Sequence, residues 1–221
     1  MTSIEQELKQ VELILIKLQS EPTFQAPLLS IGYSMEQLQQ GLMLYERART
    51  LIGERSEAQK AKLNATQDFR QIRYKAQRRY NLDLSLAKMA LGDLCDWRAL
   101  LKTNGSQHQA ADNWQREAEI FYNYLQSDAT LLELLEPYGL TSERLAASLN
   151  ALQKVDEARS THVQHHSEAN YSTHERDAAL KCLRNWLALF KISLCLACDN
   201  NPDLLASLGV EPRGQKARSQ V

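Results

Sequence analysis

Four histidines in the second half of the chain are the residues best placed to bind a metal ion. Imidazole suits zinc, copper or nickel, and two histidines one helical turn apart can share an ion. His162 and His166 have that spacing, and His174 would complete the site from an antiparallel helix. The alternative, which we favour, is that these histidines are solvated or hydrogen-bonded and make the region sensitive to pH. The cluster comprises His162, His165, His166 and His174, with Glu168 and Glu175 nearby.

Two cysteines, Cys195 and Cys198, have the Cys-x-x-Cys spacing of a redox dithiol or of half a zinc site. Redox dithiols are activated at helix N-termini, where the helix dipole lowers the thiol pKa. This pair falls in the last turn of an expected helix, and Cys182 lies more than three turns upstream. We therefore interpret the pair as small buried core residues.

A basic run that includes two tyrosines is the best candidate for contact with nucleic acid, and Arg73, Arg78 and Arg79 are its residues to test. At 100° per residue its charges spread around a helix instead of forming one stripe, and glutamates on a facing helix can neutralise them. Solvated or ion-paired side chains are therefore the favoured interpretation. The run contains Arg70, Arg73, Tyr74, Lys75, Arg78, Arg79 and Tyr80, and the glutamates are Glu46, Glu54 and Glu57.

The elements that position these residues are expected to be helices. Apolar residues recur at three- and four-residue spacing, while proline, glycine and polar clusters separate the periodic segments. Ser34 and Asn64 each precede a glutamine by three residues, which is typical of a helix start. A later helix, residues 178–198, is apolar almost all round and is predicted to be the most buried element. The helices predicted in the first half are about 4–18, 34–63, 65–91 and 93–101.

The second half of the chain repeats the first at an offset of about 107 residues. Between Leu18 and Leu42, nine of 25 positions are identical at that offset, where composition alone gives about one or two. The pattern Gly-x-Ser/Thr-x-Glu-x-Leu, which is typical of a helix cap, occurs at Gly32 and again at Gly139. At an offset of 108, the expected cap Asn64 matches Ser172. These matches predict an internal duplication.

The repeat leads to a specific architecture. We expect an all-α protein in which repeats 1–107 and 108–209 form one compact pseudo-two-fold domain, with residues 210–221 as a flexible tail. Two long antiparallel helical hairpins form a four-helix bundle, with the extra medium and short helices at one end. Residues 1–107 carry 15 basic and 12 acidic residues and residues 108–221 carry 11 and 15, so the two halves should attract. Trp97, Trp114 and Trp186 are expected in the core near that end.

Composition narrows the class of protein. With 221 residues, 43% of them hydrophobic, the chain can build a sizeable core, and its net charge of −1 gives no general attraction to nucleic acid or anionic membranes. The chain shows neither a signal-peptide pattern nor the roughly 18 uninterrupted apolar residues of a membrane span. Its four cysteines do not suggest a disulfide scaffold. We expect a soluble, cytoplasmic protein.

The functional hypotheses follow from what the sequence contains. It shows no glycine-rich phosphate loop, nucleophile elbow or identifiable acid–base pair of carboxylates, so we expect a protein that is not an enzyme and needs no cofactor. The leading hypothesis is a helical protein that acts through a protein partner or self-association. The alternatives are a small-ligand or metal-binding bundle that uses the polar histidine-rich region, and weak nucleic-acid association through the arginine run.

Overall fold

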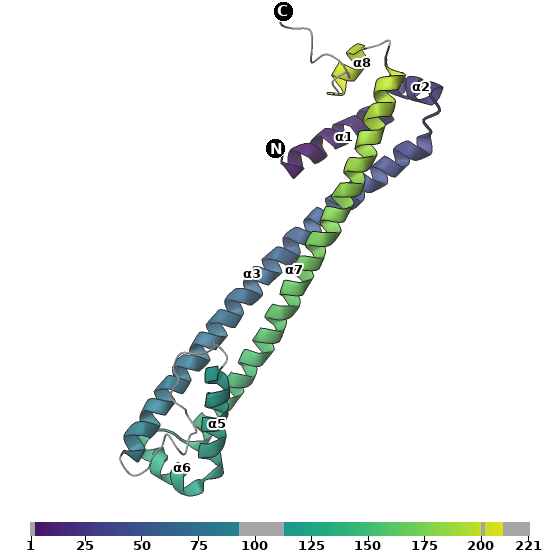
Figure 1. Ribbon diagram of the computed structural model, residues 1–221. Coiled ribbons are helices and arrows are strands. Elements are labelled where there is room, and N and C mark those ends of the chain that lie inside the picture. The colour runs from purple at the N-terminus through teal and green to yellow at the C-terminus, as the bar shows by residue number, and fades with distance from the viewer. Residues whose placement is uncertain (1–2, 93–112, 200–201, 210–221) are drawn as a thin grey trace, which may run out of the picture. The chain divides into compact units, whose positions relative to one another are not determined.

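The computed structural model describes residues 3–92, 113–199 and 202–209, and every regular element in those ranges is a helix (Figure 1). The predicted all-α fold class is therefore confirmed for the described residues. The predicted helix 93–101, with Cys95 and Trp97, and the predicted tail 210–221 lie outside them. The elements are α1 (Ile4–Ser20), α2 (Pro22–Ser30), α3 (Met35–Leu91), α5 (Asn113–Ser127), α6 (Ala129–Leu135), the 3-10 helix η1 (Glu136–Tyr138), α7 (Ser142–Ala197) and α8 (Pro202–Ser207).

Helices of similar length follow one another in the same order twice: α1, α2 and α3, then α5, α6 and α7. The start of each long helix is also alike. Gly32 and Gly139, three residues before α3 and α7, both adopt left-handed backbone angles, with φ of 81° and 83°. Ser34 then forms the predicted capping box with Gln37, and the Thr141 hydroxyl accepts a hydrogen bond from the Arg144 amide.

The long helices α3 and α7 are unbroken over 57 and 56 residues, which is about 85 Å each at 1.5 Å per residue (Figure 1). The helix starts predicted at Asn64 and Ser172 are therefore wrong. Polar residues cap helices only where the preceding backbone leaves the helical conformation, and neither position has a neighbouring proline or glycine that would force this. The Ser172 hydroxyl instead donates to the carbonyl of Ala169 one turn earlier.

The chain folds as two compact units, and α3 and α7 contribute to both. Unit 1 comprises Met1–Gln59 with Glu168–Val221, and unit 2 comprises Lys60–Ser167. Each unit therefore takes residues from both of the sequence repeats 1–107 and 108–209. In unit 1, α3 and α7 run antiparallel. Gln37 contacts Trp186, and Arg47, further along α3, contacts Glu175, which comes earlier in α7.

Each unit has its own apolar core. In unit 1, α1, α2 and α8 cover part of the α3–α7 pair, and the largest buried side chains include Ile14, Leu28 and Phe190. In unit 2, α5 and α6 do so, with Phe121 and Leu135 fully buried. Trp186 belongs to the unit 1 core as expected, whereas Trp114 is half-buried against the core of unit 2.

Residues 178–198 are apolar almost all round, but they are buried on only one face. One face of this part of α7 packs into the unit 1 core through Leu183, Leu187 and Leu194. The opposite face is exposed, and the side chains of Leu189 and Leu196 are 68% and 67% accessible. The described chain therefore supplies a cover for only one side of a helix that is apolar on both.

Candidate functional site

A carboxylate lies at the centre of unit 2. The buried face of α3 passes through Tyr80, Asp83 and Ala87, at the spacing that keeps side chains on one side of a helix. Asp83 thus occupies a core position, and its side chain is completely inaccessible to solvent. A buried carboxylate is costly unless charged and polar groups surround it, so its partners determine what the site can do.

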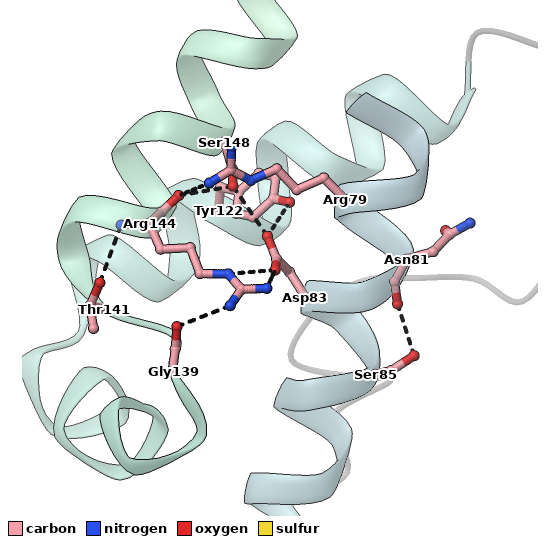
Figure 2. Close-up of polar contacts among 9 residues, drawn as sticks. All are labelled: Arg79, Asn81, Asp83, Ser85, Tyr122, Gly139, Thr141, Arg144 and Ser148. Carbon is pink, nitrogen blue, oxygen red and sulfur yellow. Dashed lines mark hydrogen bonds and ion pairs between the residues drawn. The ribbon is translucent and has the colours of Figure 1, made fainter. Parts of the chain in front are cut away.

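Three side chains from two other helices donate hydrogen bonds to Asp83 (Figure 2). Arg144, on the first turn of α7, donates to Oδ1 from Nε at 2.9 Å and from Nη2 at 2.7 Å. Tyr122, on α5, donates to Oδ2 at 2.9 Å, and the Ser148 hydroxyl lies 3.1 Å from the same oxygen. The carboxylate is therefore paired with a cation and hydrogen-bonded at both oxygens.

The protons in this cluster are constrained. Burial, with the nearby negative charge of Asp83, raises the pKa of Tyr122 well above its usual range, so the phenol remains a donor at neutral pH. Ser148 also lies 2.9 Å from the carbonyl of Arg144, and its single proton can be donated to only one of these two acceptors at a time. Tyr122 and Arg144 are thus the constant donors to Asp83.

This arrangement suits a structural role. Because Asp83, Tyr122 and Arg144 belong to α3, α5 and α7, their contacts fix how far each helix can slide along the others. The Arg144 guanidinium also donates to the carbonyl of Gly139, which ties the loop before α7 to the same cluster. Sequence reasoning missed this site. One signal in the sequence could have found it. When the chain is compared with itself at an offset of 107 residues, Asp83 aligns with Phe190, so a charged residue stands where an apolar stripe would place a core residue.

The residues 107 positions after Arg79 and Asp83, Trp186 and Phe190, belong to an aromatic cluster in unit 1. Trp186 stacks on Phe190 with ring centroids 5.0 Å apart, and Tyr33 packs edge-on to Phe190. The Trp186 indole N–H donates to the carbonyl of Gln37 at 3.2 Å, and its ring lies so close to Gly41 that no Cβ would fit there. Unit 2 has a matching contact, in which both residue numbers differ by 107 from those of Trp186 and Gln37: the side chain of Arg79 donates to the carbonyl of Arg144 at 3.4 Å.

A surface groove of about 580 Å³ lies between α3 and α7 in unit 2. Alanines such as Ala61, Ala65 and Ala158 line it together with Ile72, so the helices come close there. Its polar lining includes Asp68, Glu157, Lys154 and His165. This mixture of charges selects neither anions nor cations.

The histidines predicted to share a metal ion all lie on α7. His162 and His166 are one turn apart, with ring centroids separated by 6.3 Å, and His162 stacks on Phe69 of α3. His174 is three turns further along the same helix, so the expectation that an antiparallel helix supplies it is wrong. Within the described residues, no three histidine, cysteine or acidic side chains are grouped closely enough to hold a metal ion.

The arginines of the basic run separate into two groups. Arg79 is half-buried and bonded to α7, and Arg73 is half-buried with a polar partner. Arg78 is exposed. Glu46, Glu54 and Glu57, expected on a facing helix, lie on α3 itself, because α3 continues through residue 64. These glutamates therefore do not face the basic run from another helix, contrary to the expectation from the sequence.

The cysteine pair is buried in part. Cys198 lies in the unit 1 core, as predicted, and Cys195 is half-buried against it. Burial is the larger cause, and the nearby Cys195 the smaller, of a raised pKa for the Cys198 thiol, which keeps the thiol protonated. Cys182 is exposed on the uncovered face of α7.

Comparison of the chain with protein-family models, with curated proteins and with solved structures gives no match. A search of the helices in the described ranges for a segment with the length and hydropathy needed to cross a bilayer also finds none.

Proposed function

We propose that this protein acts by self-association, and that a second copy of the chain covers the exposed apolar face of α7 in unit 1. The observation that carries this proposal is the accessibility of that face. Leu189, Ile192 and Leu196 lie on it, and Leu189 and Leu196 are about two-thirds exposed. A helix that is hydrophobic on all sides is normally buried on all sides. The described chain covers only the other side of this helix, so we infer that a partner covers this face.

The spacing of the exposed residues fits a helical partner. They alternate at intervals of three and four, which is the heptad pattern of helices that pack side by side. Each member of the stripe is exposed, and none is charged. The single amide, Asn185, is the kind of residue that fixes register in such a seam. The stripe consists of Ala178, Cys182, Asn185, Leu189, Ile192 and Leu196.

A second copy fits the stripe in an antiparallel orientation. Two-fold association brings the same surface of both chains together, and a heptad stripe is complementary to itself. If the pair is centred near Leu189, the turn that carries Lys181 in one chain is level with the helix end near Asp199 in the other. Both charged residues are exposed, so opposite charges would meet at each end of the seam.

In such a dimer, α3 and α7 from each of two chains would make a four-helix bundle, whereas the bundle expected from the sequence lies within a single chain. The internal duplication remains part of this proposal, supported by the matched left-handed glycines and by the paired Trp186 and Arg79 contacts. At the 107-residue offset, Leu82 and Met89 of α3 match Leu189 and Leu196 and are also exposed. Ser85 stands where α7 has Ile192, so the α3 stripe is less apolar.

Sedimentation velocity of the full chain at about 1 to 100 µM tests the proposal. We expect a monomer–dimer equilibrium in the wild type and a monomer in the Leu189→Glu/Leu196→Glu variant, because each carboxylate would be buried in the seam. The matched control is Leu82→Glu/Met89→Glu, which adds the same charges at exposed positions of α3 and should dimerise like the wild type. A wild type that is monomeric throughout, or a variant that dimerises equally well, would refute the proposal.

Orientation has a separate readout. In an antiparallel seam centred near Leu189, position 182 faces position 196 of the other chain, so a Leu196→Cys variant should form an intermolecular disulfide with Cys182 on mild oxidation. In a parallel seam, wild-type Cys182 would instead pair with its own copy. Mass spectrometry of the linked peptides distinguishes these results.

A further inference from the structure

The exposed side of α3 in unit 2 carries positive charges that no ion pair with another described residue compensates. Between Phe69 and Leu82 the helix has five basic residues and no acidic one. Arg70, Lys75 and Arg78 are exposed, and none forms an ion pair with another described residue. Arginines elsewhere do form such pairs, including the pair between Arg184 and Glu7.

The nearest acidic residues along the helix do not change this sign. Asp83 is buried and paired with Arg144, so its charge is neutralised inside the unit. Asp68 precedes the basic segment and lines the groove on the side of α3 that faces α7. The segment therefore presents a net positive charge to any ligand that approaches from solvent.

An aromatic ring lies among these cations. Tyr74 is 64% exposed, and it is four residues from Arg70 and four from Arg78, so the three side chains form a row on one face of α3. At 1.5 Å per residue, the ring is about 6 Å along the axis from each arginine. Lys75 is exposed beside the row. The Tyr74 ring is therefore accessible to a ligand that also contacts the neighbouring cations.

We propose that the row Arg70, Tyr74 and Arg78, with Lys75, binds single-stranded nucleic acid. The cations would contact successive phosphates, and an unpaired base would stack on the Tyr74 ring, since a base in a single strand exposes its face. This assignment differs from the residues expected from the sequence, because Arg73 and Arg79 are half-buried. The proposal concerns α3 in unit 2 and is independent of self-association through α7.

The ring distinguishes this ligand from other polyanions. An acidic peptide would be attracted by the three cations but would gain little from Tyr74, and an anionic vesicle would respond to total charge. Base stacking makes the ring itself contribute to affinity, at about tenfold for one base. Binding should also weaken steeply with salt. Three phosphate contacts on a single strand predict a slope near −2, or a roughly 20-fold loss between 50 and 200 mM salt.

Fluorescence anisotropy of the full chain with a labelled 12-nucleotide single strand of mixed sequence tests this. We expect saturable binding with that salt slope, weaker binding to the matching duplex, and about tenfold weaker binding for Tyr74→Ala. Tyr74→Phe should retain most of the affinity, because its ring can still stack. Arg70→Gln/Arg78→Gln should leave one phosphate contact and make the slope shallower, at about −0.7.

The control Lys9→Gln/Arg116→Gln removes the same number of exposed charges from α1 and α5 and should bind like the wild type. Circular dichroism and thermal melting of each variant show whether it has folded. No saturable binding at 50 mM salt would overturn the proposal. So would equal affinity for polyglutamate or for phosphatidylserine vesicles, or a properly folded Tyr74→Ala variant that binds as tightly as the wild type.

Discussion

The two units of this protein place the same pair of helices together with opposite core chemistry. In unit 1 the buried position on the C-terminal part of α7 is Phe190, and in unit 2 the position 107 residues earlier, on α3, is Asp83. Both side chains are fully inaccessible. One is covered by aromatic rings, and the other by an arginine, a tyrosine and a serine.

A backbone contact is shared despite this difference. In each unit, a long side chain from one long helix donates a hydrogen bond to a carbonyl in the first turn of the other: Trp186 to Gln37, and Arg79 to Arg144. Helix placement thus tolerates either an apolar or a charged centre. The two centres should differ in how they fail, because an apolar core loses packing when it is altered, whereas a buried ion pair leaves an unpaired charge.

The largest expected effect follows from that unpaired charge. Arg144→Met should lower the free energy of unfolding by about 3 kcal/mol, because it leaves the Asp83 carboxylate buried without its cation. Urea denaturation followed by circular dichroism measures this. Arg47→Met, which removes an exposed ion pair with Glu175, is the matched control and should change stability by less than about 0.5 kcal/mol.

A double variant sharpens that result. Asp83→Asn/Arg144→Met removes both charges and should be more stable than Arg144→Met alone. If the two proteins were equally unstable, the cost would come from lost packing of the arginine stem and not from an unpaired carboxylate.

In unit 1 the corresponding weak point is a close contact. Gly41→Ala would place a methyl group inside the space of the Trp186 ring, and should destabilise the protein by about 1–3 kcal/mol. Gly53→Ala, on the same helix with open space around it, is the control and should stabilise by about 0.5–1 kcal/mol. Thermal unfolding compares the two. A loss in both variants would show that the ring contact is not responsible.

Two tyrosines in the core of unit 2, Tyr80 and Tyr122, make stability fall at high pH. Burial raises the pKa of Tyr80 to about 12 and that of Tyr122 further, above the usual value near 10. This stability is complete below pH 10 and is lost as pH rises from there, because the unfolded chain then releases the phenolic protons first. Tyr122→Phe should cost about 1.5 kcal/mol at pH 7 and should flatten the decline above pH 10. Urea titrations at pH 7 and pH 11 measure both effects.

The smallest effect concerns the surface of unit 1. Hydrogen bonds from Arg184, both 2.7 Å long, hold the pKa of Glu7 below its usual range. Their contribution is present above pH 4.5 and is lost as the pH falls through the lowered pKa. Because Arg184 is about half exposed, Glu7→Gln should cost at most about 0.5 kcal/mol at pH 7, and nothing at pH 2. A cost that persists at pH 2 would assign the effect to packing.

The sequence predicts the helical class and the start of α3, because apolar periodicity and the Ser34 capping box are local signals. It does not predict the length of α3 and α7. Asn64 and Ser172 resemble helix caps, and only the surrounding backbone decides whether such a residue begins a helix or lies within it.

The candidate sites are predicted less well for a related reason. Apolar character along residues 178–198 indicates that this helix needs covering, but not whether the same chain provides the cover on each side. Similarly, a lone aspartate such as Asp83 resembles a surface residue until its partners, far away in sequence, are known. The sequence does identify Arg78, whereas the exposure of Tyr74 depends on where α7 packs.

The division of the chain into units has a consequence for the order of events during synthesis. Unit 2 is one continuous stretch, so it can assemble as soon as the ribosome has released residue 167. Unit 1 must wait for the last part of α7, and until then Phe24 and Leu28 have no α7 residues to bury them. A nascent chain halted just after residue 167 has left the exit tunnel should therefore protect its central part from protease while its first 59 residues remain open to cleavage.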